Sequence, residues 1–151
     1  MLSAIKWLMS VVLLLSNAGQ AKAGQILINP GFESGSLVPW YAKSGGPVVT
    51  NAQSHAGTFS MFAMTSDEIR QDFWPISSSD ITELSFWVQL RGGAFDLVEF
   101  FYLDGSSGNS SVQGFTDNWT FFDVTSHLDA GKSLSGIGVY GSGAGAYLDD
   151  F

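Results

Sequence analysis

The segment ELSFWVQL, residues 83–90, decides the fold class, because its apolar and polar residues alternate with a period of two. Such alternation is typical of a β-strand that has one face in a core and the other toward solvent. The apolar face would carry Leu84, Phe86, Val88 and Leu90, and the opposite face Ser85, Trp87, Gln89 and Arg91. This segment therefore predicts a sheet that is covered on one side only.

Other runs of β-branched and aromatic residues recur along the chain, and glycine-rich turn sequences separate them. The runs are TFSMFAM (58–64), VEFFYLDG (98–105), WTFFDVT (119–125), LSGIGVYG (134–141) and AYLDDF (146–151). DGSSGNSS, residues 104–111, is interpreted as a mobile loop between strands. No segment has a period of 3.6 residues, and the serines and β-branched residues of SSSDITELS (77–85) argue against a helical turn there. We expect an all-β protein, a two-sheet β-sandwich of the jelly-roll kind.

The first 23 residues are typical of a secretory signal peptide. They combine one early lysine, a short apolar run and small residues at Ala21 and Ala23, which fit cleavage after Ala23. The alternative is a membrane anchor, but Trp7–Leu15 is much shorter than the roughly 20 apolar residues that a spanning helix needs. We expect a secreted or cell-surface protein without stable membrane insertion, with one domain at residues 24–151.

The charge of the expected mature chain is strongly negative. Four basic residues remain against fourteen acidic ones, a net charge of −10. A surface of this kind repels phosphate backbones, so nucleic acid is not an expected partner. The chain has no cysteine, which excludes a disulfide framework, and its stability must come from a core or a bound ion.

Three segments carry a resemblance to a known family. INPGFESGSLVPW (28–40), SHAGTFSMF (54–62) and AYLDDF (146–151) resemble carbohydrate-binding modules with the galactose-binding-like jelly-roll fold, the group often found beside xylanases and cellulases. Exported bacterial proteins with a Pro-Glu-Pro sorting tail have similar segments. That tail is absent here, and the sequence stops at Phe151 within its expected last strand. We expect either a truncated sequence or an unusually short last strand.

The resemblance implies a structural calcium ion between the N-terminal loop and the last strand. Glu33 and Asp149 would be carboxylate ligands, and Ser54 to Thr58 would contribute backbone carbonyls. Asp150 either adds a ligand or points to the other side of the strand. Oxygen ligands of this kind suit calcium, and an ion that binds only the folded chain stabilises it. The alternative is that both acids are solvated, or that Glu33 accepts N–H groups of its own turn.

The resemblance implies carbohydrate as the partner. Aromatic side chains stack on sugars and planar polar groups fix their hydroxyls, so we expect the site where both share a strand face. Trp87, Gln89 and Arg91 share one face of residues 83–91, Glu99 would join them, and Trp119 would stand at the rim. Each also has a structural interpretation: Trp87 as core, Arg91 as half of an ion pair, Trp119 as a loop cover. The resemblance does not choose between a sheet face and a loop end.

Catalysis is not expected. The two histidines, His55 and His127, lie far apart in the sequence, and GSGAG (141–145) lacks the serine of a nucleophile elbow. The sequence has neither a zinc-like cluster nor a phosphate-binding glycine loop. The expected function is non-catalytic carbohydrate binding. The alternatives are a structural or matrix protein that uses the same fold for protein contacts, and a small glycan hydrolase.

Overall fold

The computed structural model describes residues 26–91, 95–113 and 117–151, so the expected signal peptide lies outside the described residues. They form two antiparallel five-stranded sheets, as the alternating pattern predicts. The first sheet has the order β1 (Tyr41–Ser44), β4 (Glu68–Ser77), β9 (Ser133–Tyr140), β6 (Phe95–Tyr102) and β7 (Ser107–Gln113). The second has the order β2 (Val48–Thr50), β3 (Ser60–Ala63), β10 (Ala146–Asp149), β5 (Ser85–Leu90) and β8 (Thr120–Asp123).

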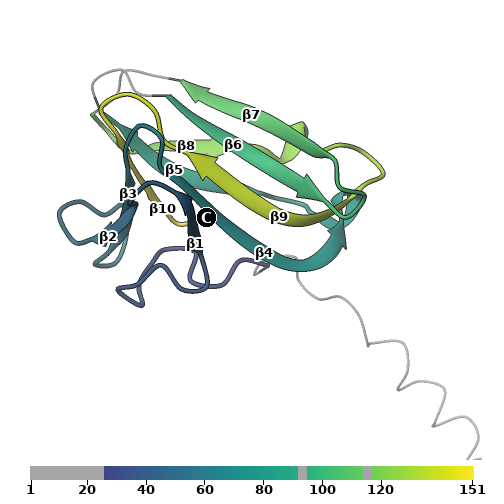
Figure 1. Ribbon diagram of the computed structural model, residues 1–151, viewed down its shortest axis with the longest axis horizontal. Coiled ribbons are helices and arrows are strands. Elements are labelled where there is room, and N and C mark those ends of the chain that lie inside the picture. Colours follow the sequence, from purple (N-terminus) through teal and green to yellow (C-terminus); the bar gives the residue numbers. More distant parts are fainter. Residues whose placement is uncertain (1–25, 92–94, 114–116) are drawn as a thin grey trace, which may run out of the picture.

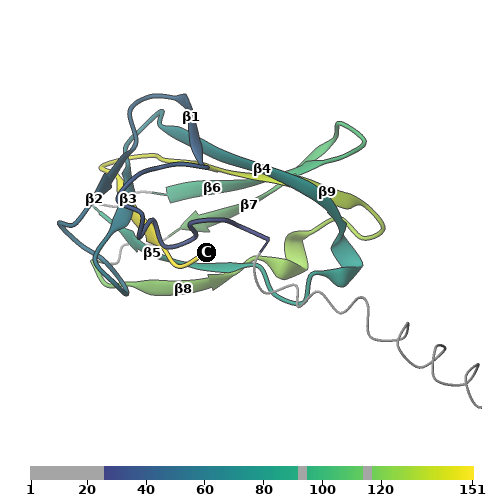
Figure 2. The same ribbon diagram turned by 90° about the horizontal axis from the view of Figure 1, so that it is seen from below.

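The two sheets stack as two layers, with β4 and β9 in one layer and β5 and β8 in the other (Figure 2). The alternation expected for β5 is confirmed, because its even-numbered residues from Phe86 to Leu90 are buried and its odd-numbered residues are partly exposed. The buried residues of β5 meet apolar side chains of the first sheet, such as Ile69, Phe100 and Ile137, in one core. The β-sandwich prediction is confirmed.

Two local predictions were wrong. Residues 107–111 belong to strand β7 rather than to a mobile loop, because they pair with β6 at the edge of the first sheet. Ser78–Asp80 form a single 3-10 turn, η3, within the segment that argues against helical structure. Tertiary contacts hold this turn: the N–H of Ser78 donates to the carbonyl of Lys132, and its hydroxyl donates to the carbonyl of Asp129. A second 3-10 turn, η4, spans Thr125–His127.

The beginning and the end of the described chain lie side by side, as both ribbon views show. Gln71 of β4 fixes the first segment, since its side-chain amide accepts from the Ile28 N–H and donates to the Ile28 carbonyl. The buried Phe32 and Trp40 of the following loop then pack against Phe151, at ring-centroid distances of 6.2 and 5.0 Å. The packing of these aromatic rings thus holds the N-terminal loop against the C-terminal residue Phe151.

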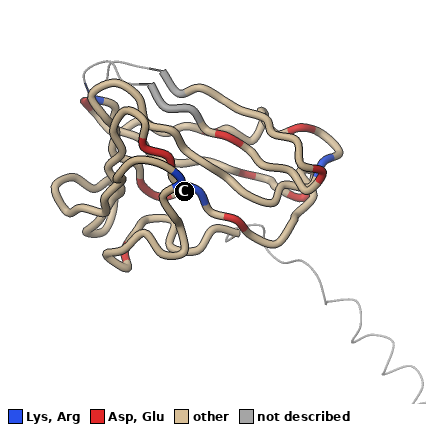
Figure 3. The backbone as a smooth tube through the Cα atoms, viewed as in Figure 1, with Lys and Arg blue, Asp and Glu red and all other residues tan. Residues whose placement is uncertain are grey.

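Acidic positions are spread along the whole sandwich, whereas basic ones are few (Figure 3). Within the described ranges, no helix is long and apolar enough to cross a membrane.

Candidate functional site

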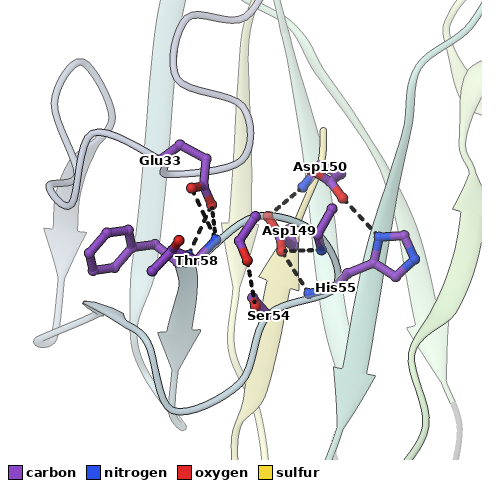
Figure 4. A network of polar contacts seen from close by, with 9 residues as sticks. Glu33, Ser54, His55, Thr58, Asp149 and Asp150 are labelled. Atoms are coloured by element: carbon purple, nitrogen blue, oxygen red, sulfur yellow. Dashed lines mark hydrogen bonds and ion pairs between the residues drawn. The ribbon is translucent and has the colours of Figure 1, made fainter.

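Three surfaces gather the side chains that matter for function, and the first is where the chain ends meet. We call it the junction: Glu33, residues 54–59, Asp149 and Asp150 (Figure 4). Glu33 accepts two backbone N–H groups. The Thr58 N–H lies 3.0 and 3.1 Å from its two carboxylate oxygens, and the Phe59 N–H lies 2.9 Å from Oε1. Glu33 thus accepts backbone N–H groups, as one alternative interpretation expected. These groups belong to a distant loop and not to the turn of Glu33 itself.

Gly57 makes this contact possible. Its φ is +63°, a backbone conformation that favours glycine, and a Cβ there would lie 2.5 Å from the Glu33 carboxylate. The sequence SHAGT thus places a glycine where the loop must turn closely over an acidic side chain.

Asp149 is fully buried at the end of β10. Its Oδ2 accepts the His55 N–H at 2.8 Å and the Ala56 N–H at 3.4 Å, and its Oδ1 accepts the Asp150 N–H at 2.9 Å. Burial raises the pKa of Asp149 to about 6, and the negative charge of Asp150 adds to this rise, although the three N–H groups oppose it. A buried carboxylate beside a second acid is a place where a cation would be stabilised.

Asp150 completes the junction from the other side. Its Oδ2 lies 2.8 Å from Nδ1 of His55, and a Cβ on Gly31 would lie 3.1 Å from its Oδ1 and 3.3 Å from Oδ1 of Asp149. Gly31 thereby lets the N-terminal loop approach both acids.

The five residues predicted as metal ligands all lie at the junction. They are Glu33, Ser54, Thr58, Asp149 and Asp150. Ser54 bonds within its own loop, its hydroxyl 3.5 Å from the Gly57 carbonyl. Within the described part of the chain, no group of three or more acidic, histidine or cysteine side chains is arranged to hold a metal. An ion here would therefore need backbone carbonyls in addition to the carboxylates.

The second surface is the outer face of β5, where Trp87 was expected to stack on a sugar. Trp87 is half-buried, and the His55 ring covers it at 3.8 Å with an interplanar angle of 12°. Phe121 of β8 packs beside it at 5.5 Å, and Trp119 approaches His55 edge-on at 5.8 Å. One face of the Trp87 indole is thus already occupied by the protein.

An open hollow lies on this second sheet beside the aromatic group. Its volume is about 220 Å³, and we call it the β5 hollow. Its described lining consists of Gln53, Gln89, Arg91, Asp117 and Tyr147. The Gln89 amide nitrogen donates to the Asp117 carbonyl, while its Oε1 is buried with no hydrogen-bond partner among the described residues.

The expectation that Glu99 joins Trp87 was wrong. Glu99 lies on β6, which belongs to the first sheet, so the core separates it from Trp87. The Tyr140 hydroxyl bonds to Glu99 and to Glu68 there, and burial together with these two carboxylates raises the pKa of Tyr140. The strands β5 and β6 are consecutive in the sequence but belong to different sheets.

The third surface is the outer face of the first sheet. We call it the β4–β9 face. The strand register places seven of its residues on one side of the sheet: Tyr41, Glu68, Arg70, Asp72, Glu99, Phe101 and Tyr140. We include the exposed Trp74, which follows Asp72 where the register of β4 shifts. Arg70 Nε lies 2.6 Å from Asp72 Oδ1, and the Tyr41 hydroxyl donates to Asp72 Oδ2 at 2.7 Å. The Arg70 guanidinium also lies 3.6 Å from the centroid of the Phe101 ring. Planar polar groups and aromatic rings are therefore held in fixed positions.

Two glycines of β9 provide the space for this arrangement. Cβ atoms on Gly136 and Gly138 would lie 2.6 Å from Asp72 Oδ1 and 3.1 Å from the Phe101 ring, respectively. The side chains of the neighbouring strands β4 and β6 can thus lie over β9.

Trp74 is the residue that the sequence analysis missed. It is 91% exposed and lies two residues after Asp72 on β4, in the stretch between Asp72 and Ile76 where the register with β9 shifts. Phe73 between Asp72 and Trp74 packs against the core. The signal that was available is the alternation of polar residues at 68, 70 and 72 with apolar residues at 69 and 73.

Several solved structures share this two-sheet architecture. A family 61 carbohydrate-binding module in complex with β-1,4-galactotriose superimposes with a TM-score of 0.61, at 19% identity over 83% of this chain and 94% of that one. A family 16 carbohydrate-binding module gives 0.60, at 15% identity over 82% and 95%. The fold is that of carbohydrate-binding modules.

A third module with this fold is the family 22 xylan-binding domain of a Paenibacillus barcinonensis protein, with a TM-score of 0.54 at 24% identity over 87% of this chain and 94% of that one. An enzymatically active domain of a bacteriophage tailspike also matches, and this chain covers 20% of it. No protein-family model and no curated protein matches the sequence.

Proposed function

We propose that this protein is an exported, non-catalytic carbohydrate-binding module whose β4–β9 face binds a neutral oligosaccharide. One observation carries the proposal: a tryptophan that is 91% exposed lies two residues after Asp72 on β4, beside an Arg–Asp–Tyr group that is fixed by short hydrogen bonds. An exposed aromatic ring offers a stacking surface, and the polar groups supply donors and acceptors for hydroxyls. The structural neighbours that bind galactotriose and xylan support this ligand class.

The shape and charge of the face narrow the ligand. The regularly paired part of β4 from Glu68 to Asp72 extends about 13 Å, and Trp74 lies beyond it, which suits a few sugar rings in a row. Glu68, Asp72 and Glu99 lie on this face of a protein whose whole chain carries a charge of −8, so polyanionic glycans would be repelled. A neutral β-linked chain fits both properties.

Retention in gels that contain neutral glycans, such as galactan and xylan, tests the proposal. We expect the glycan to retard the wild type, and Trp74→Ala to migrate freely. Phe121→Ala is the matched control, because Phe121 is an exposed aromatic residue on the second sheet. Loss of retention in Trp87→Ala with retention kept in Trp74→Ala would instead move the site to the β5 face. Unchanged mobility with every glycan would favour the structural or matrix role.

We further propose a structural calcium ion at the junction, held by the carboxylates of Glu33 and Asp149 and by backbone carbonyls within Ser54–Thr58, with Asp150 as an additional acid. The support is that the two carboxylates, 116 positions apart in the sequence, contact the same loop, and that Asp149 is buried beside Asp150. Carboxylate oxygens that accept an N–H retain further lone pairs for a cation. The ion would link the two ends of the chain and has no catalytic role in this proposal.

Melting curves with calcium and with a chelator test the ion. We expect the melting temperature to fall by several degrees on chelation, and by much less in Glu33→Ala. Glu83→Ala is the control, since Glu83 is exposed and bonds only to Ser85 among the contacts of the described residues. Equal melting temperatures of the wild type with calcium and with chelator would contradict the proposal.

A further inference from the structure

The β5 hollow lies on the opposite side of the sandwich from the β4–β9 face, because its lining strands β5 and β10 belong to the second sheet. The two surfaces therefore do not overlap. A ligand on one leaves the other free.

The hollow is lined by polar side chains whose hydrogen-bonding groups are not all paired within the described residues. The amide nitrogen of Gln89 is held by the Asp117 carbonyl, which directs the other end of the amide, and the buried Oε1 has no partner among the described residues. A buried acceptor without a donor is unfavourable, and because this atom is closed off from solvent, a hydroxyl group in the hollow would satisfy it only after the Gln89 side chain turns. Arg91 forms no ion pair within the described ranges, so its guanidinium is available to donate.

Size and charge set the class of ligand. A volume of about 220 Å³ is below the roughly 300–1,000 Å³ of sites that take drug-sized molecules, so one ring fits better than a chain. Asp117 lines the hollow together with Arg91, so its negative charge opposes a phosphate, a sulfate or an acidic sugar. Mixed donors and acceptors beside the Tyr147 ring are suited to a neutral polyol.

We propose that the β5 hollow binds a single neutral sugar residue, either a chain end or a branch, so that the module has two carbohydrate sites on opposite faces. This inference rests on the proposed function of the β4–β9 face only in taking carbohydrate as the ligand class. A module with two such sites would link two glycan chains, and its avidity for a branched glycan would exceed the affinity of either site.

Titration of the ¹⁵N-labelled mature protein with D-galactose and with D-xylose, followed by NMR, tests the hollow directly. The side-chain amide signals of Gln53 and Gln89 report on it, and the indole signal of Trp74 reports on the opposite face. We expect a free monosaccharide to shift the two glutamine signals in the wild type. Arg91→Ala should weaken this binding about tenfold or more, because a charge-assisted hydrogen bond is lost. Trp74→Ala should leave it unchanged.

The outcomes separate the two proposals. If neither monosaccharide shifts the glutamine signals while an oligosaccharide shifts Trp74, the hollow is not a sugar site and the proposed function stands. If the glutamine signals shift equally in the wild type and in Arg91→Ala, the hollow does not bind as described and the inference is overturned. If Trp74→Ala abolishes the shift, there is one site and not two. If no sugar moves any of these signals, both proposals fail.

Discussion

The junction and the β4–β9 face differ in how the sequence builds them. The junction joins three short segments whose residues are recognisable one by one: an acid after Gly31, a glycine in SHAGT and a pair of aspartates at the end. The β4–β9 face joins side chains of four strands, and only the strand register brings them together. The comparison suggests a division of roles, in which the junction determines stability and the face determines binding.

The largest expected effect is the pH dependence of stability at the junction. Asp149 has a pKa of about 6 in the folded protein against an ordinary value of 3.8, so the folded state takes up the proton more readily. In chelator, the free energy of unfolding should therefore fall as pH rises from about 4 to 6, by about 3 kcal/mol at most. Denaturant unfolding at several pH values measures it.

Asp149→Asn should remove this pH dependence, and calcium should reverse it, because the ion competes with the proton for the carboxylate. Carbohydrate affinity measured across the same pH range at saturating calcium should stay constant. An affinity that follows the titration of Asp149 would show that the junction and the face are not separate.

The second effect belongs to the face. Trp74→Ala should lower oligosaccharide affinity at least about thirtyfold, as expected for the exposed aromatic residue that supplies the stacking surface. Because Trp74 is 91% exposed, the free energy of unfolding should change by less than about 0.5 kcal/mol. Calorimetric titration and denaturant unfolding on one preparation give both numbers. A large loss of stability without loss of affinity would assign Trp74 to the structural part of the molecule.

The third effect returns to the junction. Gly57→Ala should destabilise the protein by about 1–3 kcal/mol, since φ is +63° and the new Cβ would meet the Glu33 carboxylate. Gly46→Ala is the matched control, because a Cβ there meets nothing within 4 Å. Equal melting temperatures for the two variants would mean that the loop is not held by Glu33.

The smallest effect is expected for Gly138→Ala on β9. The added Cβ would lie 3.1 Å from the Phe101 ring and 3.3 Å from the Ile69 carbonyl, so the ring and the Arg70 above it must move slightly. We expect a loss of affinity of a few-fold, measured by the same titration, with little change in the melting temperature. An unchanged affinity would remove Phe101 and Arg70 from the site.

Features that arise within one segment of the sequence were predicted better than features that depend on how the strands pair. The two-sheet sandwich and the faces of β5 follow from alternation within one strand, which the sequence shows directly. That Glu33 and Asp149 meet at residues 54–58 was implied by the family resemblance, and the structure adds that Gly57 and Gly31 permit the close approach. What failed depends on sheet membership: β5 and β6 are consecutive, yet Glu99 lies across the core from Trp87.

Alternation within a strand also does not reveal whether another side chain covers an outward-facing residue. Alternation places Trp87 on an outer face, but it does not show that His55, from a loop 32 positions earlier, stacks on the ring at 3.8 Å. Trp74 is in the reverse situation: alternation from residue 68 places it on the outer side, but its residue type does not distinguish it from Phe73, which packs against the core. Exposure is decided by neighbours that are distant in the sequence.

The indole N–H signal of Trp74 during titration with a neutral oligosaccharide, β-1,4-galactotriose or a xylan fragment, tests the central claim most directly. If the β4–β9 face binds sugar, this signal shifts and saturates, while the signal of the buried Trp40 stays in place. If saturating oligosaccharide moves only the Trp87 and Trp119 signals, or none at all, the face is not the binding site.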